Sequence, residues 1–266
     1  MIGLFKKLAA NRNLLKNLIL RDLKHRYVGS IGGFLWSVIH PVVLLISYTF
    51  IFGVIFRPDM GPEFGTNSFA IFVLCGLLPW LLFSDTVIRN CSVISDNAPL
   101  ITKTVIPAEI LPISITISNL VHHMIGLGIL LGVMLAFYTV HLSVAWILLY
   151  MVMLLMLAQG LGWIVAGLHV FLRDTIQALQ IVLLLWFYFT PILYTQHQME
   201  RVPPAIRFLA GLNPMAVIVT GYRNSLLHLA QPAPAQIAIV LATSFAVFVI
   251  GALLFRQAKP AFPDVL

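Results

Sequence analysis

The chain has 266 residues, of which 60% are hydrophobic and only 9% are charged. Soluble domains carry about 25% charged residues, and a water-soluble fold of this size could not bury so much apolar surface. The composition therefore indicates a membrane protein. The net charge of +7 does not indicate nucleic-acid binding, because no separate basic domain accompanies it.

The first 33 residues predict an amphipathic helix ahead of the membrane domain. Over 4–24, leucines and isoleucines follow one stripe of a helix, and Lys6, Asn13, Arg21 and Lys24 lie opposite. Such a helix is expected to lie flat on a membrane face with its cations among the lipid head groups. We therefore divide the chain into an interface segment, 1–33, and a transmembrane domain, 34–266.

The apolar runs that follow are long enough to cross a bilayer. A helical span needs about 20 apolar residues, and continuous rather than alternating apolar runs favour helices over a β-barrel. The runs cover 34–56, 68–88, 110–138, 144–171, 176–194 and 235–255. We therefore expect an all-α membrane fold with six transmembrane helices.

Small residues recur every four positions in two of these runs. Gly128, Gly132 and Ala136 form one ladder, and Ala158, Gly162 and Ala166 form another. Such faces allow close packing of helices, either within one subunit or between subunits.

The segment 195–234 is too long for a simple turn. It contains two partly apolar stretches, 204–211 and 215–229, with Asn213–Pro214 between them. Proline pushes the residue before it out of the helical region, so a helix is expected to begin there. The segment predicts a re-entrant helical hairpin, and a loop resting on the membrane surface is the alternative.

The distribution of basic residues predicts the orientation. The six spans divide the 16 lysines and arginines between the two sides of the membrane. One side holds Lys6, Lys7, Arg12, Lys16, Arg21, Lys24, Arg26, Arg89, Lys103, Arg173, Arg256 and Lys259; the other holds Arg57, Arg201, Arg207 and Arg223. Positive charge accumulates on the cytoplasmic side, so both termini are expected in the cytoplasm and 195–234 outside.

Several chemical classes are disfavoured by missing motifs. The sequence has no GxxxxGK[ST] loop, no GxSxG elbow and no HExxH pair, and its two cysteines form no CxxC motif. We therefore expect no catalytic residues, no metal site and no ATP hydrolysis by this chain. The scarcity of charges within the spans also disfavours an ion-coupled transporter, so the energy for any active transport would come from another subunit.

Seven short motifs follow one another along almost the whole chain. They are Arg21-Asp22-Leu23-Lys24-His25-Arg26-Tyr27 with Ser30, Gly33, Trp36 and Pro41, Gly76-Leu77-Leu78-Pro79-Trp80-Leu81-Leu82-Phe83-Ser84, Ile101-Thr102-Lys103-Thr104-Val105-Ile106-Pro107 with Leu111-Pro112, Phe171-Leu172-Arg173-Asp174, Thr190-Pro191-Ile192-Leu193-Tyr194, Asn213-Pro214 and the ending Pro260–Leu266. In this order they resemble one family, the ABC-2 type permeases that export polysaccharide. The last stretch departs from the family pattern at Pro263, where alanine is expected.

The resemblance implies a homodimer in a bacterial inner membrane that pairs with two copies of an ATP-binding subunit. ATP and Mg²⁺ would be bound by that partner, and this chain would bind no cofactor. A lipid-linked polysaccharide would pass between the two permeases. O-antigen is the favoured cargo; capsular polysaccharide, teichoic acid, and a drug or lipid cargo are the alternatives.

The resemblance also implies roles for particular residues. The connection 94–107 would contain a coupling helix that contacts the ATP-binding subunit through Asn97, Leu100 and Lys103, with Arg21 and Arg26 nearby. The external segment would act as a gate, where Arg207 or Arg223 could meet a phosphate or an acidic sugar. A plain solvated loop and lipid head-group contact are the respective alternatives.

Aromatic patches are the candidates for a translocation path, because aromatic faces can carry sugar rings without strong hydrogen bonds. The predicted residues are Trp36, Tyr48, Trp80, Phe83 and Tyr188. Ordinary core packing or a belt of aromatic residues at the membrane interface would use the same residue types.

Overall fold

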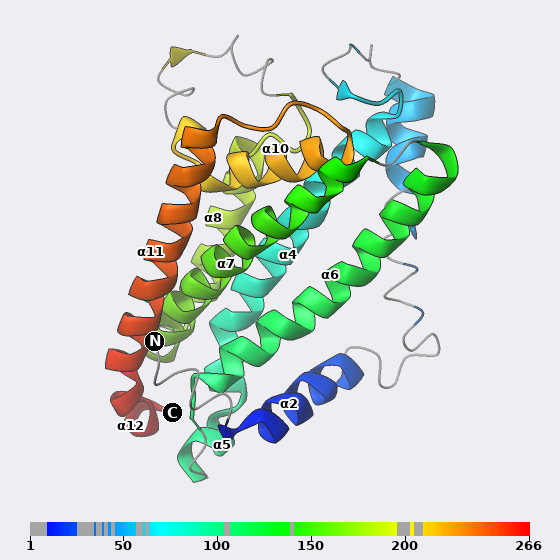
Figure 1. Ribbon diagram of the computed structural model, residues 1–266. Coiled ribbons are helices and arrows are strands. Elements are labelled where there is room, and N and C mark those ends of the chain that lie inside the picture. The colour runs from blue at the N-terminus through cyan, green and yellow to red at the C-terminus, as the bar shows by residue number, and fades with distance from the viewer. Residues whose placement is uncertain are drawn as a thin grey trace.

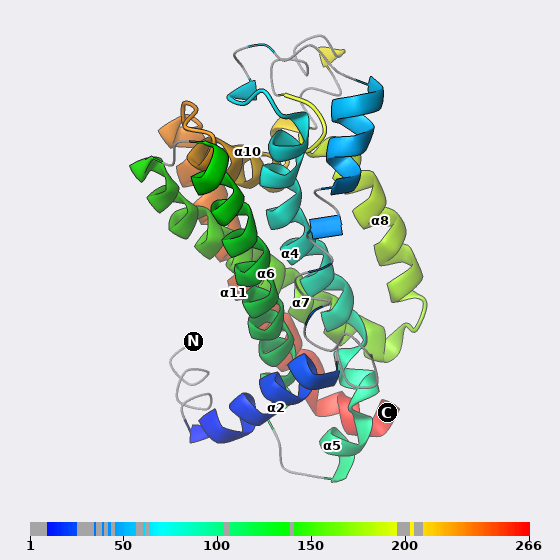
Figure 2. The ribbon, with the colours of Figure 1, turned by 90° about the vertical axis from the view of Figure 1, so that its right-hand side faces the viewer.

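The fold is given by a computed structural model (Figures 1 and 2). It describes residues 10–25, 46–56, 64–103, 107–138, 141–195 and 210–266, and also 35, 39, 42–43, 61 and 203–204. All regular structure in these ranges is helical, which confirms the predicted all-α class.

Four helices in the described ranges are long and apolar enough to cross a membrane. They are α4 (Phe69–Asp96), α6 (Ile110–Phe137), α7 (Trp146–Phe171) and α11 (Pro234–Ala258). The 28 residues of α4 correspond to about 42 Å at about 1.5 Å per residue, which exceeds the roughly 30 Å hydrocarbon core. These helices match four of the six predicted spans.

The other two predicted spans differ from these. Helix α8 (Thr175–Phe189) has 15 residues, about 22 Å, and is therefore shorter than the predicted run 176–194. It ends where the chain bends over Thr190–Tyr194. Of the run 34–56, the structure describes chiefly η2 (Thr49–Phe56), a π-helical segment. A six-span count therefore stays a prediction.

Helix α4 is the centre of the bundle, in contact with α6, α7, α8 and α10. Most of its residues are buried. Pro79 lies within the helix and removes one backbone N–H donor from its hydrogen bonds. Helix α7 lies between α4 and α11. At the α7–α11 crossing the two backbones approach closely at Gly160 and Gly251. A Cβ added to Gly251 would lie only 2.1 Å from the carbonyl oxygen of Gly160, so no larger residue fits there without a shift of the helices.

The predicted small-residue ladders contribute unequally to this packing. Gly162 makes room for Asn90, whose side-chain nitrogen would lie 2.4 Å from an added Cβ. Gly128 and Gly132 have open space around them. The ladder on α6 therefore makes no close crossing within the described part of one subunit, while the Gly160–Gly251 crossing lies outside both ladders.

The two ends of the bundle carry different short helices (Figures 1 and 2). At one end, called the α5 end below, lie α2 (Arg12–His25), α5 (Ala98–Lys103), η6 (Lys259–Ala261) and α12 (Phe262–Val265). At the other, called the α10 end, lie η4 (Leu142–Ala145) and α10 (Pro214–Leu226), and α10 runs across the bundle in Figure 1.

Candidate functional site

At the α5 end, helix α2 packs against the bundle through its apolar stripe. Leu18 is buried in a cluster with Val93 and Ile94 of α4 and with Ile110, Leu111 and Ile115 of α6. The sequence predicted the stripe but assigned it to lipid. Its central residue is instead covered by protein, a distinction that amphipathic periodicity does not make.

Two of the residues predicted to couple to an ATPase are brought together here. The guanidinium of Arg21 donates a hydrogen bond of 2.8 Å to Oδ1 of Asn97, the residue between α4 and α5. The side-chain nitrogen of Asn97 donates to the carbonyl of Val93 at 2.9 Å. Asn97 therefore fixes the turn into α5 and, at the same time, ties it to α2.

The other predicted coupling residues are placed less completely. Leu100 is half-buried in α5. Lys103 ends that helix, and its side chain lies outside the described part, as does Arg26. The backbone of α5 thus agrees with a short helix in the predicted connection 94–107.

The carboxyl terminus is docked at the same end, which sequence reasoning had flagged only as a family signature. Phe262 is buried beside Phe255, with ring centroids 5.4 Å apart. Lys259 donates a hydrogen bond of 2.9 Å to Glu109, just ahead of α6. Helix α12 also contacts α5, so the chain end contributes to the surface around the predicted coupling helix.

The predicted path residues are partly covered by α8. Trp80 and Phe83 are buried. The ring of Trp80 lies 5.6 Å from that of Phe187, and the ring of Phe83 lies 5.1 Å from that of Trp186. Within one subunit these two α4 residues therefore pack in the core, because α8 shields them.

The remaining path residues have different surroundings. Tyr188 is 61% exposed on the outward face of α8. That face also exposes Ile181, Val182, Leu184, Leu185 and Phe189. Tyr48 is half-buried against the main core, and Trp36 lies outside the described residues.

At the α10 end, the side chain of Asn213 forms hydrogen bonds with residues of both α8 and α10. Its side-chain oxygen accepts from the backbone nitrogen of Met215 at 2.9 Å and from the indole nitrogen of Trp186 at 2.7 Å. Its side-chain nitrogen donates to Thr190 at 2.9 Å. Asn213 therefore caps the predicted helix start at Pro214 and also holds the end of α8.

Arg223, one of the two predicted gate residues, is buried at 3% exposure. Its guanidinium donates to the carbonyl of Ile192 at 2.7 Å and of Phe72 at 3.2 Å, and lies 3.8 Å from the centre of the Phe72 ring. A guanidinium held in this way does not face a phosphate at the surface, so its burial favours a structural role, and the gate role of Arg223 stays a prediction. Sequence position alone could not reveal this burial. Arg207 lies outside the described residues.

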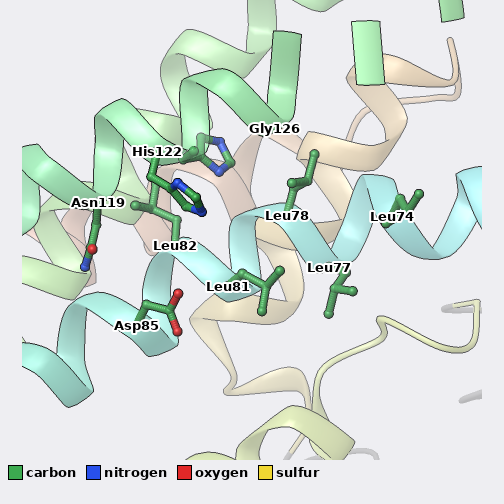
Figure 3. A pocket seen from close by; sticks show the side chains of 10 residues that line it. Leu74, Leu77, Leu78, Leu81, Leu82, Asp85, Asn119, His122 and Gly126 are labelled. Atoms are coloured by element: carbon green, nitrogen blue, oxygen red, sulfur yellow. The ribbon is translucent and has the colours of Figure 1, made fainter. Parts of the chain in front are cut away.

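A small hollow opens between α4 and α6 (Figure 3). Leucines of α4 form its apolar wall, and polar groups meet at one side (Figure 3). It is lined by Leu74, Leu77, Leu78, Leu81, Leu82, Asp85, Asn119, His122, His123 and Gly126. No group of three metal-ligating side chains occurs in the described ranges.

The fold and these ends define a multi-span helical membrane protein with one end built from packed short helices. Residues 13–227 match the family model described as ABC-2 type transporter. The chain belongs to the ABC-2 type transporter family.

Two relatives are similar over most of the chain, and a third is similar over a shorter stretch. An O-antigen export system permease protein RfbA from Myxococcus xanthus is 34% identical over 228 residues, which cover 84% of each chain. A protein of the same name from Klebsiella pneumoniae is 26% identical over 263 residues, 96% of this chain and 95% of the relative. The polysialic acid transport protein KpsM of Escherichia coli is 34% identical over 80 residues, 30% of each chain.

Proposed function

We propose that this chain is the membrane-spanning subunit of an ABC exporter that moves a lipid-linked polysaccharide, O-antigen, across a bacterial inner membrane. The observation that carries the proposal is its similarity, over 84% of each chain, to a permease named for O-antigen export. Membership of the ABC-2 type family supports a transport rather than an enzymatic role.

The proposed topology has six spans and both termini in the cytoplasm. The α5 end is the cytoplasmic end, because α2 brings Arg12, Lys16, Arg21 and Lys24 there, and basic residues accumulate on the cytoplasmic side. The α10 end is then external, and α10 is one arm of a re-entrant hairpin over 195–234.

The proposed assembly is a homodimer with two ATP-binding subunits, which hold ATP and Mg²⁺. This chain binds no cofactor of its own and has no catalytic site. The ATP-binding subunit contacts α5 through Asn97, Leu100 and Lys103, with Arg21 and Arg26 beside it. The Arg21–Asn97 hydrogen bond of 2.8 Å supports this assignment, because it links the two proposed contact segments.

The proposed path for the polymer lies between two copies of the chain, next to α8. The exposed apolar face around Tyr188 supports this placement, because large exposed apolar faces mark contacts with lipid or protein. Trp80 and Phe83 form the layer behind α8, and Trp36 and Tyr48 would contribute from the first span. Arg207 is the remaining candidate for an external contact with an acidic group.

Deletion of the gene in its native host tests the proposed cargo. We expect loss of the O-antigen ladder on lipopolysaccharide gels and accumulation of lipid-linked polymer inside the cell, both reversed by the wild-type gene. Loss of capsule with an intact ladder would instead assign capsular polysaccharide, which the partial similarity to a polysialic acid transport protein favours as the second candidate. Unchanged surface glycans in a host without a second exporter would refute both.

A further inference from the structure

The carboxylate of Asp22 on α2 is the centre of a polar cluster at the α5 end. It accepts hydrogen bonds from the guanidinium of Arg89 on α4 and from the hydroxyl of Ser118 on α6. Arg89 also donates to the side-chain oxygen of Asn119 at 2.8 Å. One carboxylate therefore binds α2 to two of the long apolar helices.

The cluster continues into the bundle. Asn119 donates to Thr86 of α4 at 3.1 Å. One turn further along, Asn90 donates to Thr116 at 3.3 Å, and Thr116 donates to Gln159 of α7 at 2.6 Å. Polar contacts thus extend from α2 through α4 and α6 to α7.

The Asp22–Arg89 pair differs from an ordinary surface ion pair in its shielding and its partners. Their side chains are 14% and 30% exposed, and each holds a second partner in a fixed direction. Exposed pairs contribute little because water screens them, whereas shielded, charge-assisted hydrogen bonds resist rearrangement. The pair is therefore able to transmit a displacement of α2.

The neighbouring residue extends the contact in the opposite direction. Arg21 reaches Asn97 at the start of α5, while Asp22 reaches α4 and α6. One turn of α2 is thus attached both to the predicted coupling connection and to the transmembrane helices.

We propose that Asp22 and Arg89 are positioning residues that lock α2 to α4 and α6, so that a push on the α5 end moves these helices as one body. The inference rests on the proposed function in one respect: an ATP-binding subunit supplies the push. We call the hydrogen bonds that join Asp22 to Arg89 and Ser118 the lock. These bonds have to persist through the transport cycle, because their loss would let α2 move while the transmembrane helices remain still.

The first test uses Asp22→Asn and Arg89→Lys in the complex with its ATP-binding subunit. Lysine keeps the charge but cannot donate to Asp22 and Asn119 with the fork of a guanidinium. We expect normal membrane levels and normal co-purification of the ATP-binding subunit, but at least tenfold less polysaccharide exported per ATP hydrolysed. Lys16→Gln, an exposed change on the same helix, should leave this ratio unchanged. A wild-type ratio in both lock variants would overturn the proposal.

A second readout does not depend on the cargo. With the buried Cys75 and Cys91 replaced by serine, Leu184→Cys places a thiol on the exposed face of α8. We expect maleimide labelling of this thiol to change with ATP in the wild-type background and not in Arg89→Lys. ATP-dependent labelling that persists in Arg89→Lys would refute the lock. If the labelling behaves as expected while gene deletion spares every surface glycan, the proposed cargo fails and the lock stands.

A third test replaces the hydrogen bond between Asp22 and Ser118 with a disulfide, and it remains informative if the first variants fold poorly. Asp22→Cys with Ser118→Cys, in the same serine background, places two thiols where the carboxylate and hydroxyl meet. The reduced protein should lose export, and oxidation to the disulfide should restore it, because the lock works in its closed state. A cross-linked protein that remains inactive would show that α2 must separate from α6, contrary to the proposal.

Discussion

Replacement of Arg223 distinguishes a structural role from the gate role that the sequence suggested. Arg223→Ala removes two hydrogen bonds from a charged donor, at 2.7 and 3.2 Å, and the contact with the Phe72 ring. Each such hydrogen bond contributes about 1.5–3 kcal/mol, and a desolvated cation–π contact contributes about 2 kcal/mol. Since neighbouring contributions do not simply add, we expect a loss of about 3–5 kcal/mol.

Arg223→Lys provides the matched comparison. Lysine keeps the positive charge but cannot donate to both carbonyls in the geometry of a guanidinium, so about half of the loss should remain. The measurement is the thermal midpoint of the detergent-solubilised protein, followed by size-exclusion retention. By the scaling for domains of similar size, Arg223→Ala should lower the midpoint by about 6–20 °C, and Arg223→Lys should fall between it and the wild type.

The gate role predicts a different pattern for the same variants. If Arg223 bound an acidic cargo, lysine would preserve much of the export and alanine would abolish it, with little change in the midpoint of either variant. An unchanged midpoint in Arg223→Ala would therefore refute the structural assignment. A parallel fall in stability and membrane level would support it.

Three further predictions concern the crossing, the coupling contact and α8. Gly251→Ala places a Cβ 2.1 Å from the carbonyl oxygen of Gly160, so the overpacking should lower the free energy of unfolding by about 1–3 kcal/mol or more. The control variant Gly128→Ala lies in open space and should leave the thermal midpoint within about 2 °C of the wild-type value. Arg21→Gln loses the charged donor to the α5 turn and should weaken co-purification of the ATP-binding subunit; wild-type recovery would count against that contact. Tyr188→Ala, a 61% exposed site, should lower export with an unchanged midpoint, and full export would remove it from the path.

The class of the protein could be predicted from the sequence alone. In a bilayer, the backbone N–H and C=O groups of a long apolar run have to be hydrogen-bonded within the protein, which favours a helix. Four such runs form α4, α6, α7 and α11. The start of α10 could also be predicted from neighbouring residues alone, because Asn213 caps the helix that Pro214 begins. Family motifs along the chain indicated the same class, and the family match supports it.

The candidate site was predictable only in part. The pairing of Arg21 with Asn97 agrees with two segments that the motifs singled out, yet their contact joins residues 76 positions apart. The motif Arg21-Asp22 was visible, but nothing in it indicated Arg89 or Ser118 as the partners of Asp22. Side-chain partners across helices depend on helix rotation and crossing, which hydrophobic periodicity leaves open.

Tertiary structure alone decided which polar and aromatic residues are exposed. Composition, length and charge placement determine that the chain lies in a membrane and predict its orientation, because these are sums over many residues. The burial of Arg223 between α10 and α4, and of Trp80 and Phe83 behind α8, depends on how particular helices pack. Individual roles therefore follow from a few contacts between distant segments, which no local pattern specifies.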